Sequence, residues 1–112
     1  MYKELILFRN ELKNKSIPKY KVIGIVSELL LSKQIFLKNV DIEEFLNDVF
    51  GLKFKAYLYK SRTMVVARVT KEIIALEKEN EYKNKLYKFV QKKIDESKDN
   101  EKKEKNQLDG WI

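Results

Sequence analysis

The residue types that carry most enzyme chemistry are missing from this chain. Its 112 residues include no Cys and no His, which removes thiolate nucleophiles, imidazole bases, disulfides and nearly all zinc sites. Carboxylates remain, and four of them gather at Asp41, Glu43, Glu44 and Asp48. Paired carboxylates can hold Mg²⁺ or act as acid and base, but no second cluster of polar groups accompanies these. We therefore predict that the chain is not an enzyme and that it uses no metal and no cofactor.

Positive charge is concentrated in one segment, KFKAYLYKSRTMVVARVTK, at residues 53 to 71. No Asp or Glu occurs from residue 49 to residue 71, although the chain has 17 acids. In such a segment Lys and Arg can pair with phosphates, Arg can read base edges, and Tyr can donate to phosphate oxygens. The candidate DNA-binding residues are Lys53, Lys55, Tyr57, Tyr59, Lys60, Ser61, Arg62 and Arg68. The alternative is a solvated, lysine-rich surface without a partner.

The composition indicates one small domain with acidic partners. The formal net charge is +7, which favours nucleic acid first and an anionic membrane surface second. No apolar run approaches the roughly 18 residues of a membrane span, and the N-terminal stretch MYKELILFRNELKNK is typical of an amphipathic helix. We expect a cytoplasmic protein without a membrane partner.

The elements before the basic segment are predicted to be mainly helical. Apolar spacings of three and four predict an amphipathic helix over 3–14, and a helix over 19–32 is apolar on most sides and so the most buried. Residues 33–40 fit a brief strand or an extended linker. A helix over 41–50 follows, with Asp41 as its N-cap, and Gly51 ends it.

The basic segment itself fits two patterns. Read with period two, Phe54, Ala56 and Leu58 share one face before the tip KSR, and Thr63, Val65, Ala67 and Val69 share one face after it. This alternation favours a β-hairpin. Read with period 3.6, Leu58, Val65, Val69, Ile73 and Leu76 form a helical stripe, and the tip lacks the Asn-Gly or Asp-Gly typical of tight hairpins. A long helix therefore remains the alternative, and a bihelical unit turning at Gly51 would expose Lys55, Tyr59, Lys60 and Arg62.

A last helix is predicted over about 72–96. Its apolar stripe, which includes Leu86, Val90 and Ile94, packs either on its own domain or on a second copy of the chain. Residues 97–112 have no apolar anchor before their LDGWI end, and their four Lys are balanced by four acids. We predict a folded domain over residues 1–96 and a disordered charged tail over 97–112.

This order of elements indicates a fold class. Helix, helix, short strand, helix, hairpin and helix predict an α+β fold, a small winged helix-turn-helix-like domain with a β-hairpin followed by a C-terminal helix. The run NVDIEEFLNDVFGLKFKAYLYKSRTMVVARVTKEI, with the helices before it, resembles the accessory DNA-binding proteins of clostridial conjugative-plasmid relaxosomes (the TcpK type). The resemblance covers roughly residues 3 to 75 and is one of order, size and charge.

The resemblance implies a function. It implies a dimeric, sequence-specific binder of double-stranded DNA that acts at an origin of transfer beside other DNA-processing proteins, with DNA met by the hairpin region. A transcriptional regulator of a mobile element is the nearest alternative. The alternative from another class is a basic protein-interaction module that inhibits a host protein.

Overall fold

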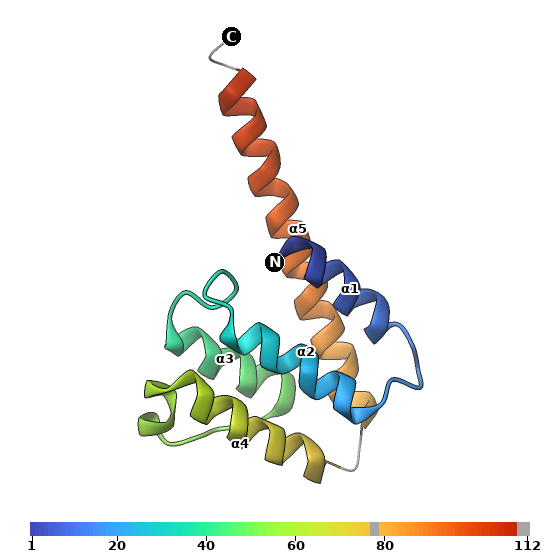
Figure 1. Ribbon diagram of the computed structural model, residues 1–112, viewed down its shortest axis with the longest axis vertical. Helices are drawn as coiled ribbons and strands as arrows, with labels where there is room; N and C mark the ends of the chain where they lie inside the picture. Colours follow the sequence, from blue (N-terminus) through green and yellow to red (C-terminus); the bar gives the residue numbers. More distant parts are fainter. Residues whose placement is uncertain (77–78, 110–112) are drawn as a thin grey trace.

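The computed structural model describes the backbone of residues 1–76 and 79–109 and the side chains of residues 1–76 and 82–98. Over this part of the chain every regular element is helical (Figure 1). The elements are α1 (Tyr2–Leu12), α2 (Lys19–Leu31), α3 (Asn39–Phe50), the 3-10 helix η1 (Ala56–Lys60), α4 (Arg62–Ala75) and α5 (Glu79–Asp109). The helix α3 begins two residues before Asp41, so Lys38 and not Asp41 is its N-cap.

The predicted α+β winged-helix fold is wrong, because residues 53–71 form no hairpin. They form an extended connection, η1 and most of α4. The hairpin would place Thr63, Val65, Ala67 and Val69 on one face, yet only Val65 and Val69 of these four are buried. With Ile73 these two valines make the buried stripe of a helix, so period 3.6 prevails over period two. The same helix takes in Glu72 and Ile73, which the sequence assigns to the last helix.

The helices α2 and α4 form an antiparallel pair (Figure 1). A cation from each helix binds the carboxyl end of the other. Lys19 Nζ, at the start of α2, donates to the carbonyls of Ile74 and Leu76 at 3.2 and 2.6 Å. Arg62, at the start of α4, donates to the carbonyls of Leu30 and Ser32 at 3.4 and 3.2 Å. The last carbonyls of a helix lack partners within the helix and carry its negative dipole end, so both contacts stabilise the pair.

The remaining helices pack around α5. The helices α1 and α3 both contact it, and its apolar stripe is fully buried at Leu86, Val90 and Ile94. An aromatic cluster of Phe36, Phe45 and Phe89 joins the loop before α3, α3 itself and α5, with ring centroids 4.5 to 5.6 Å apart. The last helix therefore packs on its own domain, which resolves the alternative that the sequence leaves open.

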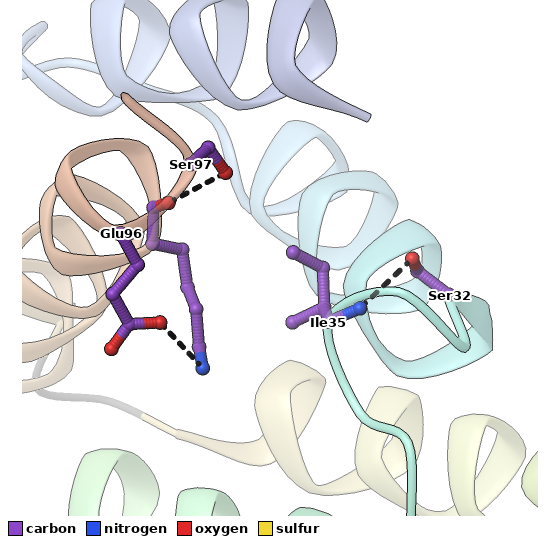
Figure 2. Close-up of polar contacts among 5 residues, drawn as sticks. Ser32, Ile35, Glu96 and Ser97 are labelled. Carbon is purple, nitrogen blue, oxygen red and sulfur yellow. Dashed lines mark hydrogen bonds and ion pairs between the residues drawn. The ribbon is translucent and has the colours of Figure 1, made fainter. Parts of the chain in front are cut away.

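Local signals explain where two of these elements end. Gly51 takes the left-handed conformation (φ 67°) at the end of α3, and its N–H donates to Asn47 O while Leu52 N donates to Leu46 O. This is the glycine stop that the sequence predicts. After α2, Ser32 Oγ accepts from Ile35 N at 3.3 Å and starts the loop to α3 (Figure 2). That loop is a linker and contains no strand.

The far part of α5 projects away from the other helices (Figure 1). Near the point where it leaves them, Lys93 pairs with Glu96 at 3.3 Å, and Ser97 Oγ donates to Lys93 O at 2.9 Å (Figure 2). The division at residue 96 and the disordered tail over 97–112 stay predictions, and the last residues of LDGWI lie outside the described part. No helix among the described residues is long and apolar enough to cross a membrane.

The burial of the α5 stripe leads to a stability prediction. Leu86→Ala should lower the free energy of unfolding by about 2–5 kcal/mol, because it empties a fully buried site. Urea unfolding followed by circular dichroism measures this, with Lys85→Ala, at the exposed neighbouring position, as the control. If Leu86→Ala changed the oligomeric state and not the stability, α5 would be an interface helix after all.

Candidate nucleic-acid interface

The structure divides the eight candidate DNA-binding residues into two groups. Lys53, Lys55, Tyr57, Lys60 and Arg68 are exposed and free to meet a partner. Tyr59 is buried, and the side chains of Ser61 and Arg62 make hydrogen bonds within the domain. The eight side chains therefore do not form one continuous surface.

Arg62 is the centre of a polar cluster that holds three elements together. Its guanidinium donates to the carbonyls of Leu30 and Ser32, to Asn39 Oδ1 at 3.1 Å and to the carbonyl of Phe36. Asn39 in turn donates through Nδ2 to Tyr59 O at 2.5 Å. Since all three guanidinium nitrogens are engaged, Arg62 cannot read a base edge without breaking the cluster. We assign it to the fold.

Ser61 begins α4 as its N-cap. Its Oγ accepts from Met64 N at 3.4 Å and lies 3.1 Å from Thr63 Oγ1. A serine at this position satisfies one of the free N–H groups of the first turn. The residues KSR at the predicted hairpin tip therefore mark a helix start.

Tyr59 lies inside the domain, with 7% of its surface exposed. Burial raises the pKa of its hydroxyl, the Phe54 backbone acts in the opposite direction, and the charge of Glu43 adds to the increase. The neighbouring Tyr57 remains 59% exposed. Of the two tyrosines only Tyr57 is available to a ligand.

The outer face of α4 is an exposed basic surface near these residues. Val65, Val69 and Ile73 turn inward, and the side chains on the opposite side are exposed: Thr63, Met64, Ala67, Arg68, Lys71 and Ile74. Short side chains, one Arg and one Lys thus alternate with Met64 and Ile74, which are 49% and 61% exposed. The period-two pattern does not identify Met64, Ala67 and Ile74 as candidate contact residues. The helical stripe of Val65, Val69 and Ile73 is the signal that could have found them, because they lie outside that stripe.

Three further lysines of the acid-free segment are also exposed. Lys53 and Lys55 lie in the connection between α3 and η1, and Lys60 ends η1, which packs against both α3 and α4. We give the five exposed cations of this segment one name, the basic face: Lys53, Lys55, Lys60, Arg68 and Lys71.

Two other charged clusters are weaker candidates. The first is the group of cations from α1 to the start of α2: Arg9, Lys13, Lys15, Lys19 and Lys21. Within it Lys19 donates to the carbonyls at the end of α4, and Arg9 donates to Gln91 Oε1 at 3.4 Å. The acids of α3 separate: Asp41, Glu44 and Asp48 line a pocket of about 220 Å³ with Lys92 and Lys93, and Glu43 lies toward Tyr59. Within the described residues no group of acids is arranged to hold a metal ion.

Comparison with known proteins identifies no family for this chain. Neither the models of protein families nor the curated proteins nor the solved structures include a match to this chain. The resemblance to relaxosome accessory proteins therefore stays a prediction, and the winged-helix fold that it implies is not the fold of this chain.

The role of Arg62 is testable by stability. Arg62→Met should lower the free energy of unfolding by about 2–3 kcal/mol, because several buried carbonyls lose a charged donor. Arg68→Met is the matched control, and we expect a change within about 0.5 kcal/mol at this exposed position. Equal stability of the two variants in urea unfolding would show that Arg62 is a surface residue.

The burial of Tyr59 is testable by titration. Tyr59 should ionise at a higher pH than an ordinary tyrosine, because burial raises its pKa above the usual value of 10.0. A raised pKa means that its neutral form stabilises the fold below pH 10, and this contribution is lost as the pH rises further. Ultraviolet difference titration of the unchanged chain against Tyr59→Phe isolates the Tyr59 hydroxyl. Ionisation of Tyr59 at or below pH 10 would contradict its burial.

Proposed function

We propose that this chain binds double-stranded DNA through the outer face of α4 and catalyses no reaction. The observation that carries the proposal is an exposed helix face with Arg68 and Lys71, inside a segment without acids from residue 49 to residue 71. A single α-helix fits the major groove of B-form DNA. On this helix Ala67 and Thr63 are short enough to allow close approach of the DNA. In this proposal α4 takes the place of the predicted hairpin as the element that meets DNA.

The chemistry of the basic face suggests separate roles. Lys60 ends η1, which packs against α4, and Lys53 and Lys55 precede η1; all three are exposed, so their ammonium groups can neutralise phosphates of the DNA backbone. Arg68 lies on α4 itself and can donate two hydrogen bonds to one guanine. Met64 and Ala67 can contact thymine methyl groups. Affinity would thus come mainly from the lysines and sequence preference from α4.

A second function is favoured by one specific observation. Met64 and Ile74 are large apolar side chains exposed on the same face as Arg68 and Lys71. Such a mixed face also fits an acidic protein partner, which is the protein-interaction alternative. In either case the cytoplasm is where we expect the protein to act. A role at an origin of transfer, or in regulating a mobile element, rests on the family resemblance alone.

Binding to DNA is tested by fluorescence anisotropy on a mixed-sequence duplex at several salt concentrations. If the four lysines of the basic face meet phosphates, log K should fall with log salt with a slope of about −3 to −4. Lys71→Ala should reduce that slope by about 1 on every sequence. Arg68→Ala should instead remove preference among sequences, at a cost of about 1–3 kcal/mol on the best site.

The control for both variants is Lys88→Ala, at an exposed position on α5. It removes the same charge without touching the basic face, so it should leave the affinity nearly unchanged. Absence of binding at low salt would refute the proposal and leave the protein-interaction alternative. If the duplex is bound, selection of bound sequences from a random duplex library identifies the preferred site.

A further inference from the structure

The helix α2 carries a face that is largely exposed. Tyr20, Gly24, Ser27 and Leu31 follow one another at spacings of four, three and four, on the side away from the core. Tyr20 is 71% exposed and Leu31 is 51% exposed. We call these four residues the α2 stripe. The stripe has a large side chain at each end, Tyr20 and Leu31, and the small residues Gly24 and Ser27 between them.

Gly24 has no role inside the domain. A Cβ added at Gly24 would meet nothing within 4 Å, and among the described residues only Gly51 has a positive φ. Neither packing nor backbone conformation within the chain therefore requires glycine here. In the middle of a helix, glycine costs roughly 1 kcal/mol relative to alanine. A close approach by another helix is the physical reason that would account for this residue.

Two opposite charges flank the α2 stripe. Lys21 and Glu28 are both exposed, and seven residues separate them, which is roughly 10 Å along a helix. They are too far apart to pair with each other, and neither makes an ion pair within the described part of the chain. The helix thus offers one free cation before its centre and one free anion after it.

This pattern is complementary to itself in the antiparallel direction. If a second copy of α2 crossed the first midway between residues 24 and 27, Lys21 would lie about 3 Å along the helix axis from Glu28 of the second copy. The two long side chains can span this offset, and the same holds for Glu28 and Lys21 of the second copy. Tyr20 would face Leu31 of the second copy, and Gly24 would face its Ser27. Such reciprocal pairing is what a twofold interface requires, because residue i meets j and j meets i.

A groove beside Leu31 can receive the tyrosine. It has a volume of about 400 Å³ and is lined by Met1, Glu4, Glu28, Leu31, Ser32 and Gln34. Tyr20 of the second copy would reach this groove, where the carboxylates of Glu4 and Glu28 can accept a hydrogen bond from its hydroxyl. The groove therefore complements a side chain that projects from the same surface.

We propose that two copies of this chain associate through α2, antiparallel and crossing between Gly24 and Ser27. The association goes beyond DNA binding and does not depend on it. One helix face from each copy is smaller than the roughly 1,600 Å² of a standard interface. The dimer is therefore reversible and forms as the protein concentration rises.

Sedimentation velocity of the full chain over a range of concentrations, without DNA, tests the proposal. Self-association should weaken at least tenfold in Lys21→Glu and in Glu28→Lys, because each change sets two like-charged pairs against each other. An equimolar mixture of the two variants should associate again, and so should the double variant, because opposite charges face each other in both. A monomer at every concentration, or no recovery in the mixture, would overturn the proposal.

A substitution at Gly24 separates association from folding. Gly24→Leu has room in the single chain and improves helix propensity, so the melting temperature should not fall. The same side chain would hold the two helices apart and abolish the dimer. Ala67→Leu, on the exposed face of α4, is the control and should leave association unchanged. A Gly24→Leu protein that still dimerised would place the interface elsewhere.

Discussion

The charged hydrogen bonds of Arg62 are the interaction on which the arrangement of this domain depends. One guanidinium holds the end of α2, the loop that follows it and the beginning of α3, while its own backbone begins α4. Lys19 makes the corresponding contact at the other end of the α2–α4 pair. These two cations position α4 with its buried stripe inward, and that orientation is what leaves Arg68 and Lys71 on the outside.

The sequence predicts the features that depend on neighbouring residues. The glycine stop at Gly51 is confirmed, because it follows from a local pattern. The choice between hairpin and helix at residues 62–71 is not local. Val65 and Val69 fit both the period of a strand and the period of a helix. A hairpin would bury Ala67 with them and a helix would bury Ile73, so the choice depends on which of these two residues joins the core.

The division between structural and free cations is also not local. The acceptors of Arg62 lie between 23 and 32 residues away in the sequence, so nothing beside Arg62 distinguishes it from Arg68. Both look like surface cations in a basic segment. Only the fold shows that one neutralises a helix end and the other projects from an open helix face. The acid-free segment therefore indicates where positive charge gathers, and it does not say which charges remain for a partner.

Phe36 links the two halves of the molecule in a way that bears on cooperativity. Its ring stacks on Phe89 of α5 at 5.6 Å and tilts against Phe45 of α3, while its carbonyl accepts from Arg62 at the start of α4. The α2–α4 pair and the bundle around α5 thus share one residue through both its side chain and its backbone. Loss of either half would remove a partner from the other, so the domain should unfold as one thermodynamic unit and not in two steps.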